Sequence, residues 1–270
     1  SETRPKGPIG EMAKIISLVK GKSGKGVGKA SKRTKRPVGL WETNQTGEEL
    51  AKNSEKSERI ELIAAREPQS IQAESFRSVR TTLLVSAPPG RIKAIFFTSP
   101  LAQEGKSSTI SNLGITLAEA GKRVVIVDSD LRKPRQSRIF GVSSAGGPGL
   151  SRFLSSNIDP AEIIKATEIP NLQLIASGPR PANPIELLTS EKMDSLVAYL
   201  KRSFDFVLFD TPPLLAVSDA LAMGPMADAI ILVVRGGQTP IPAIKQAKQK
   251  LDAHKLKCLG VILNGVDLVE

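Results

Sequence analysis

Short runs of apolar residues recur along the chain, and each ends at a polar turn. They occupy residues 92–97, 124–128, 206–210 and 258–264. The runs at 124–128 and 206–210 show no apolar/polar alternation, which is typical of parallel strands buried on both faces. Apolar residues recur at helical spacing in residues 69–86, 109–120 and 191–202. Strands and helices in this order predict an α/β fold with a mostly parallel sheet flanked by helices.

Residues 99–108, of sequence SPLAQEGKSS, lie between the strand at 92–97 and the helix at 109–120. A strand that turns sharply into a helix directs several backbone N–H groups and the positive end of the helix dipole at one point, which favours a bound phosphate. We expect Lys106 to reach the terminal phosphates of a nucleotide and the Ser107 hydroxyl to face Mg²⁺. Because Pro100 replaces the first glycine of the G-x-x-x-x-G-K-[ST] pattern, this motif needs support from elsewhere.

Aspartates that follow two of the predicted strands supply this support. Asp128 and Asp130 come at the end of the run at 124–128, and Asp210 ends the run at 206–210. A single aspartate after a strand is typical of a turn. Three of them at the carboxyl edge of a parallel sheet instead predict a cluster beside Lys106. Carboxylates and phosphates in one place require a cation, so the sequence predicts a Mg²⁺-nucleotide site.

Charge divides the chain into two parts. Residues 1–40 contain eleven Lys or Arg and two Glu, and they account for +9 of the net charge of +11. Residues 21–39 are rich in Gly, Lys and Ser, a composition that predicts disorder. Four apolar residues just before them recur at helical spacing: Ile9, Met12, Ile16 and Val19. They fit either an amphipathic helix on an anionic membrane or the lead-in to a linker, while nucleic acid ranks third because aromatic residues are few.

The sequence therefore predicts a basic, largely disordered segment or linker at residues 1–57 and a folded domain at residues 58–270. No apolar run approaches the roughly 20 residues that cross a membrane, so we expect a soluble chain. Cys258 is the one cysteine and His254 the one histidine. We interpret Cys258 as a small core residue and His254 as a surface or capping residue.

The predicted helix at 69–86 carries an E-x-x-R-x-x-R pattern formed by Glu74, Arg77 and Arg80. Residues three apart lie on adjoining parts of one helix surface. By itself this pattern is typical of a solvated helix face.

Together, the motifs of residues 70–264 resemble those of the bacterial tyrosine kinases that control capsular and exopolysaccharide export. The shared motifs are the S-x-x-x-x-E-G-K-S loop from Ser99 to Ser107, the V-D-x-D-L-R segment that begins at Val127, the D-T-P-P segment that begins at Asp210, the G-P-R-P-A-N-P-I-E-L-L segment at 178–188 and the G-V-I-L-N end of the last strand at 260–264. The resemblance implies a P-loop NTPase of the deviant Walker A type, similar to MinD and ParA.

The resemblance also implies a set of site residues and the cofactors ATP and Mg²⁺. The catalytic residues would be Lys106, Asp128, Asp130 and Asp210. The nucleotide would contact Gln103, Glu104, Gly105, Lys106, Ser107, Ser108 and, at the adenine, Asn264. Mg²⁺ would be held by Ser107, Asp128 and Asp210, directly or through water. Asp128 would also orient or deprotonate the attacking tyrosine hydroxyl, and Arg132, Lys133 and Arg135 would either attract an acidic substrate or form a solvated loop.

The partners implied by the resemblance are other copies of the chain in a ring, assembled through Glu74, Arg77 and Arg80. They also include a membrane activator (a polysaccharide co-polymerase segment in the same or a separate chain), tyrosine-containing protein substrates and a phosphotyrosine phosphatase. The expected location is the cytoplasm, at the inner face of the bacterial plasma membrane. We do not expect nucleic acid as a partner.

Two departures from related patterns matter. Partitioning and cell-division-positioning ATPases carry a signature lysine where this chain has Leu101, which argues against that subfamily. Relatives that are kinases end in a tail with several tyrosines, whereas the one tyrosine here, Tyr199, lies in the predicted helix at 191–202, where we expect it to be partly buried. A tail removed by truncation is the first interpretation, and an enzyme that acts only on other proteins is another. The alternative function is a nonkinase ATPase or nucleotide-gated assembly regulator.

Overall fold

A computed structural model describes residues 15–19, 62–86, 90–142 and 147–266. These residues form one sheet of eight strands in the order β1-β8-β7-β2-β6-β3-β5-β4. All neighbouring strands run parallel except β4 and β5. The predicted α/β class with a mostly parallel sheet is confirmed. The strands are β1 (Ile15–Val19), β2 (Ala94–Thr98), β3 (Val124–Asp128), β4 (Lys165–Ala166), β5 (Leu172–Ile175), β6 (Phe206–Asp210), β7 (Ala229–Arg235) and β8 (Cys258–Val266).

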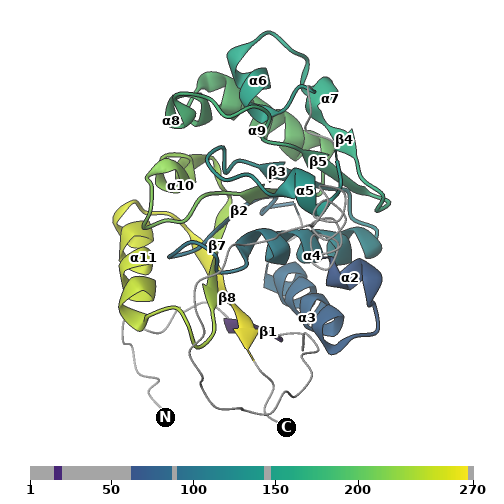
Figure 1. The fold of residues 1–270 in the computed structure, drawn as a ribbon, viewed down its shortest axis with the longest axis vertical. Coiled ribbons are helices and arrows are strands. Elements are labelled where there is room, and N and C mark those ends of the chain that lie inside the picture. Colours follow the sequence, from purple (N-terminus) through teal and green to yellow (C-terminus); the bar gives the residue numbers. More distant parts are fainter. Residues whose placement is uncertain (1–14, 20–61, 87–89, 143–146, 267–270) are drawn as a thin grey trace, which may run out of the picture.

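Helices cover both faces of the sheet. Helices α2, α3 and α4 lie together on one side (Figure 1), and their apolar side chains share a core cluster with one face of the strands. Helices α6 to α11 contribute apolar side chains to a second cluster on the other face. The helices are α2 (Ile63–Arg66), α3 (Ile71–Ser86), α4 (Lys106–Glu119), α5 (Gln136–Ile139), α6 (Leu150–Ser155), α7 (Pro160–Ile163), α8 (Pro184–Leu188), α9 (Glu191–Ser203), α10 (Asp219–Ala222) and α11 (Ile241–Ala253), with a 3₁₀ turn η1 (Gly224–Met226).

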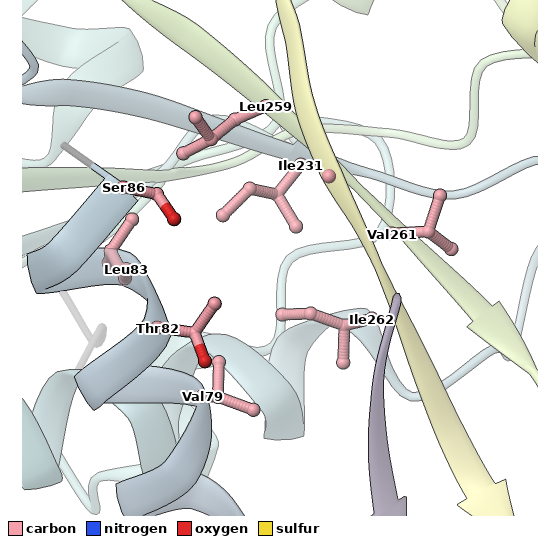
Figure 2. A pocket seen from close by; sticks show the side chains of 9 residues that line it. Val79, Thr82, Leu83, Ser86, Ile231, Leu259, Val261 and Ile262 are labelled. Carbon is pink, nitrogen blue, oxygen red and sulfur yellow. The ribbon is translucent and has the colours of Figure 1, made fainter. Parts of the chain in front are cut away.

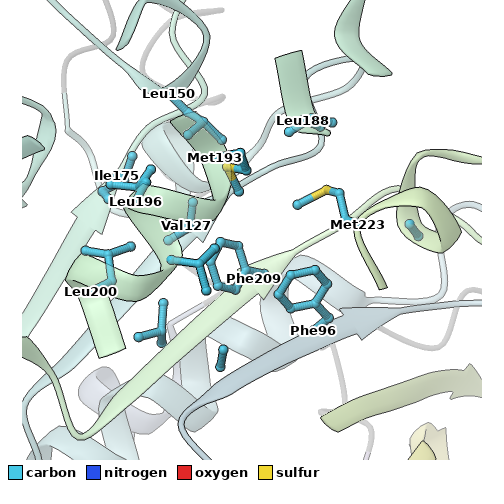
Figure 3. Packing of buried hydrophobic residues seen from close by; sticks show 14 of the residues in the cluster. Phe96, Val127, Leu150, Ile175, Leu188, Met193, Leu196, Leu200, Phe209 and Met223 are labelled. Atoms are coloured by element: carbon cyan, nitrogen blue, oxygen red, sulfur yellow. The ribbon is translucent and has the colours of Figure 1, made fainter. Parts of the chain in front are cut away.

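Strand β2 is buried on both faces of the sheet, as predicted for apolar runs without alternation. Successive side chains of a strand point to opposite faces. Ile95 and Phe97 therefore enter the cluster beneath α3 and α4, whereas Phe96 enters the other cluster. Figure 3 shows Phe96 against Phe209 of β6, with their ring centroids 4.5 Å apart. Burial on both faces leaves only the carboxyl ends of these strands open to a ligand.

Residues 15–19 form a strand at the edge of the sheet, so the helical interpretation of this stretch is wrong. Strand β1 runs parallel to β8, with Ile15 opposite Val261 and Ile16 opposite Ile262. A short isolated helix is marginally stable in water, whereas an unpaired strand edge offers a row of backbone hydrogen bonds. The remaining part of the helical pattern, residues 9–14, and the predicted disordered stretch at 21–39 lie outside the described residues.

Tyr199 and His254 behave as predicted, whereas Cys258 lies at the margin of the core. Tyr199 is half-buried on α9 and packs against the apolar cluster. His254 is exposed at the C-terminal end of α11, with its ring Nδ1 2.8 Å from the Lys250 carbonyl oxygen. Cys258 is half-buried, and this burial raises the pKa of its thiol. Among the helices of the described residues, none is long and apolar enough to cross a lipid bilayer.

Candidate functional site

A phosphate-binding loop, residues 99–105, connects the end of β2 to the start of α4. Two of its residues have positive φ angles: 65° at Gln103 and 81° at Gly105. Lys106 and Ser107 form the first turn of α4. The loop opens onto a cavity of about 230 Å³. The cavity is lined by Ser99, Ala102, Gln103, Glu104, Gly105, Lys106, Ser107, Asp130, Lys133, Arg135 and Pro213.

The loop is held from behind by the ends of β7 and β8. Arg235 Nη1 donates to the Gln103 carbonyl oxygen at 3.2 Å, and Asn264 Nδ2 donates to the Glu104 carbonyl oxygen at 3.0 Å. The Glu104 carboxylate accepts from the Thr239 hydroxyl at 2.5 Å, although burial raises its pKa. These contacts satisfy the carbonyl groups of Gln103 and Glu104, and the Glu104 carboxylate also accepts from the Leu101 N–H at 3.2 Å.

Parallel register brings the predicted aspartates together. Asp128, the last residue of β3, lies directly opposite Asp210, the last residue of β6. Asp210 forms a buried ion pair with Lys106, whose side chain is 8 % exposed. The ammonium of Lys106 approaches from α4, and the carboxylates of Asp128 and Asp210 approach from the sheet. These three side chains form the expected cluster at the carboxyl edge of the sheet.

Asp128 has one carboxylate oxygen fully engaged and the other without a partner. Its Oδ2 accepts from the backbone N–H groups of Arg135 at 3.0 Å and Gln136 at 2.9 Å. Its Oδ1 is buried and makes no hydrogen bond. Burial, reinforced by the charge of Asp210, raises the pKa of Asp128 to about 8. A buried oxygen that lacks a partner is costly, so Asp128 Oδ1 is the atom of this cluster best suited to receive a cation or a proton.

Asp130 and the basic residues after it line the side of the cavity. Asp130 Oδ1 accepts from the Lys133 backbone N–H at 3.0 Å, and burial raises the pKa of its carboxyl. Arg132 instead turns away from the cavity and binds the buried Asp219 of α10 at 2.8 and 3.0 Å. Of the three basic residues considered for substrate attraction, only Lys133 and Arg135 therefore line the cavity.

The remaining predicted nucleotide contacts divide into two groups. Ser107 lines the cavity. Ser108 and Asn264 are not among the lining residues. The Ser108 carbonyl accepts from Asn112 Nδ2 at 2.8 Å within α4, and the Asn264 amide supports the loop. Their contact with a nucleotide stays a prediction.

Gln136 is a site residue that the motifs did not indicate. It is fully buried at the start of α5, and its side chain contacts both Asp210 and the carbonyl of Ser107. Nothing in the apolar pattern distinguishes this glutamine from the polar residues of a surface turn.

The residues at this site fit a Mg²⁺-nucleotide. Among the described residues, no three His, Cys, Asp or Glu side chains are arranged to hold a metal without further ligands. Mg²⁺ is commonly held by one or two carboxylates together with phosphate oxygens and water. The unpartnered Asp128 Oδ1, the Ser107 hydroxyl group and the loop N–H groups provide for this kind of binding.

A second cavity is unsuited to a charged ligand. It has a volume of about 30 Å³ and lies between α3 and strands β7 and β8 (Figure 2). None of the described residues that line it is ionisable, and Ser86 and Thr82 supply its side-chain oxygens. About 30 Å³ is the share of one water molecule in the liquid.

The three charges of the E-x-x-R-x-x-R pattern do not form one exposed face. Glu74 and Arg77 pair at 3.1 Å near the start of α3, and Arg77 also donates to the Pro68 carbonyl oxygen at 2.6 Å. Arg80 instead donates to the Thr116 carbonyl oxygen of α4 at 3.1 Å. The solvated-face interpretation therefore applies to Glu74, which is 68 % exposed, and not to Arg80.

Comparison with known proteins identifies the family of this chain. A family model described as an AAA domain matches residues 102–256. The tyrosine-protein kinase YwqD of Bacillus subtilis is 36% identical over 219 residues, which are 81% of this chain and 92% of YwqD. The tyrosine-protein kinase Wzc of Salmonella typhimurium is 30% identical over 230 residues, which are 85% of this chain and 32% of Wzc.

Solved structures show the same fold. The kinase domain of the Escherichia coli tyrosine kinase ETK superposes with a TM-score of 0.74 at 29% identity, over 77% of this chain and 81% of that domain. The septum site-determining protein MinD of Pyrococcus horikoshii, in complex with Mg-ADP, has a TM-score of 0.55 at 24% identity, over 64% of this chain and 70% of MinD. The likeness to MinD shows only the shared fold.

The phosphate-binding loop has no room for a side chain at Gly105. A Cβ atom there would lie 1.9 Å from Asn264 Nδ2. We expect Gly105→Ala to displace the loop and abolish the rise in melting temperature that Mg-ADP gives the wild type, measured by differential scanning fluorimetry.

Gly121→Ala is the matched control for this experiment. Gly121 also has a positive φ, 74°, but no atom lies within 4 Å of its Cβ position. The control incurs the same backbone strain, about 1–2 kcal/mol, without the collision. An equal Mg-ADP response in both variants would contradict this account of the loop.

Asp128 should make the nucleotide-free protein less stable as the pH rises. Its ordinary pKa is 3.8, and the folded value is about 8. Between these values the unfolded chain releases this proton while the folded protein retains it, so stability falls with pH across this window. Because asparagine does not titrate, Asp128→Asn should not show this fall in stability with pH. Calorimetry without Mg²⁺ or nucleotide should show the variant melting several degrees above the wild type at pH 8.5, since ~1 kcal/mol corresponds to about 2–4 °C. The gap should shrink towards pH 5; a constant gap would contradict the assigned pKa.

Proposed function

This chain belongs to the bacterial tyrosine-protein kinases, and we propose that it transfers the γ-phosphoryl group of ATP to tyrosine side chains of proteins. The observation that carries the proposal is the convergence of Lys106, Asp128 and Asp210 at the start of α4. The family membership rests on YwqD, 92% of which this chain covers at 36% identity.

Positioning and charge neutralisation supply most of the catalysis in phosphoryl transfer. The backbone N–H groups of residues 103–107 and the N-terminus of α4 would hold the β-phosphate. Lys106 would exchange its contact with Asp210 for the terminal phosphates. Bound Mg²⁺ would neutralise phosphate charge, and Ser107, Asp128 and Asp210 would hold it directly or through water.

Asp128 has a free oxygen for the proton that the reaction releases. As the phenol oxygen bonds to the γ-phosphorus, the bond from that phosphorus to the bridging oxygen breaks and ADP leaves with its electron pair. The phenol proton would pass to Asp128 Oδ1, which has no hydrogen-bond partner among the described residues, and Asp128 would then hold Mg²⁺ only through water. The backbone donors on Oδ2 keep the carboxylate oriented during this step. Asp130 would fix the following turn through the Lys133 N–H, and Lys133 and Arg135 would attract acidic residues around the acceptor tyrosine.

The acceptor tyrosine comes from outside residues 1–270. Tyr199 is the one tyrosine of the sequence, and it is half-buried against the core. A tyrosine that packs against the core from within a helix is a poor substrate for the cavity of another molecule. Tyrosine-containing proteins are therefore the proposed substrates.

We also propose the setting of this activity. The chain spans only 32% of the length of Wzc, and we propose a membrane activator in the same or another chain. The proposed process is capsular or exopolysaccharide synthesis and export at the inner face of the plasma membrane, with a phosphatase reversing the modification. Residues 58–270 would form the kinase domain and residues 1–57 a basic linker that bears strand β1. Glu74 and Arg77 would contact a second copy in a ring, while Arg80 would keep α3 fixed on α4.

The kinase activity is tested with a tyrosine-rich acidic peptide, Mg-ATP and concentrated protein, analysed by mass spectrometry. We expect phosphotyrosine with the wild type and at least a ~100-fold loss with Lys106→Met, because methionine cannot neutralise phosphate charge. Lys245→Met, at an exposed lysine of α11 that does not line the cavity, is the control and should retain activity. Production of ADP without phosphotyrosine, even with a membrane activator fragment added, would favour the nonkinase ATPase instead.

A further inference from the structure

One buried side chain joins the three motifs of the nucleotide site. Gln136 Nε2 donates to Asp210 Oδ2 at 2.7 Å and to the Ser107 carbonyl oxygen at 3.1 Å. The backbone N–H of the same residue donates to Asp128 Oδ2 at 2.9 Å. Gln136 therefore contacts the first turn of α4, the end of β6 and the end of β3 simultaneously.

The orientation of the Gln136 amide is fixed by its partners. A carboxylate and a peptide carbonyl can only accept hydrogen bonds, so the nitrogen must face Asp210 and Ser107. Oε1 faces the Ser111 hydroxyl group of α4 at 2.8 Å. Both N–H groups and one lone pair of the oxygen are thus used, and the side chain is fully buried. A buried amide with both N–H groups engaged holds its neighbours in one arrangement.

The neutral charge of Gln136 suits this position. Asp128, Asp130 and Asp210 face a single nearby ammonium group, that of Lys106. A second cation beside Asp210 would compete with Mg²⁺, and a further carboxylate would repel the phosphates. An amide binds Asp210 without either effect.

Gln136 also determines how the carboxylate of Asp210 is oriented toward a ligand. Lys106 approaches Oδ1 and Gln136 approaches Oδ2, so both oxygens of the carboxylate are held. When Lys106 turns to the phosphates, the bond from Gln136 is the contact that keeps Asp210 facing Ser107. The Ser107 hydroxyl and Asp210 would then stay at a fixed spacing, as a shared cation requires.

We propose that Gln136 is a positioning residue for phosphoryl transfer, which fixes Asp210 and the first turn of α4 relative to Asp128. The inference rests on the proposed kinase function. It assigns Gln136 no contact with the reacting atoms, since its side-chain partners are Asp210, Ser107 and Ser111.

The test replaces Gln136 by Met, which has nearly the same length and no donor. We expect kcat for peptide phosphorylation to fall ~10–100-fold, the usual effect of removing a group that orients metal ligands. The KM for ATP should stay within about threefold, because the loop N–H groups still bind the phosphates. The Mg²⁺ concentration that half-maximally raises the melting temperature in the presence of ADP should rise about tenfold. A general structural defect would lower the ATP affinity together with kcat and would not selectively raise the Mg²⁺ requirement.

Two further variants serve as a matched control and as a second test of the positioning role. Gln173→Met makes the same substitution at a half-buried glutamine of β5, away from the site, and should leave all three quantities unchanged. Gln136→Asn retains the amide but is one methylene shorter, so it cannot span Asp210 and the Ser107 carbonyl. We expect its kcat to fall as in Gln136→Met. If circular dichroism shows that Gln136→Met does not fold, Gln136→Asn alone tests the positioning role.

The activity of the wild type distinguishes failure of the proposed kinase function from failure of the positioning role of Gln136. No phosphotyrosine with the wild type would overturn the kinase function and the role of Gln136 with it. An active wild type with folded Gln136 variants of equal kcat and Mg²⁺ dependence would overturn the positioning role alone. Loss of ATP binding in parallel with kcat in both variants would also overturn it.

Discussion

Three buried carboxylates at the head of the sheet face one buried ammonium, and this imbalance of charge governs the site. Asp128 and Asp210 end adjacent parallel strands in register, so their carboxylates cannot move apart. Burying such charges is costly unless they are paired or protonated. Lys106 pairs with Asp210, and the pKa of Asp128 rises to about 8. The site therefore favours a cation carried in with phosphates, which is the chemistry of a Mg²⁺-nucleotide.

The surrounding structure prevents the buried carboxylates and Lys106 from moving apart. The apolar side chains of β2, β3 and β6 pack on both faces of the sheet, so the strand ends are fixed by the core. Gln103 of the phosphate-binding loop has a positive φ angle, which persists because Arg235 and Asn264 hold the carbonyl groups of Gln103 and Glu104. Gln136 connects loop, helix and strands with a neutral amide. Each of these supports lies outside the ligand cavity, yet each limits where a phosphate or a cation can bind.

Sequence reasoning predicted the parts of the site that depend on strand ends. Apolar runs locate strands, and the carboxyl ends of parallel strands share one edge, so the sequence alone placed Asp128, Asp210 and Lys106 together. Contacts that depend on side-chain direction could not be predicted. Arg80 and Arg132 looked like solvated charges, but one binds the Thr116 carbonyl and the other binds Asp219. The edge strand β1 was missed because residues 9–19 also fit a helical period, and its pairing with β8 spans more than 200 residues of sequence.

Proton release on nucleotide binding tests the account most directly. At pH 7 the Asp128 carboxyl, with a pKa of about 8, is mostly protonated in the nucleotide-free protein. A bound Mg²⁺-nucleotide should stabilise the carboxylate and expel this proton. Calorimetric titration with Mg-ADP in buffers of different ionisation enthalpy should therefore show release approaching one proton per site, abolished by Asp128→Asn. Binding without proton release, or release that Asp128→Asn leaves unchanged, would contradict the central role of these buried carboxylates.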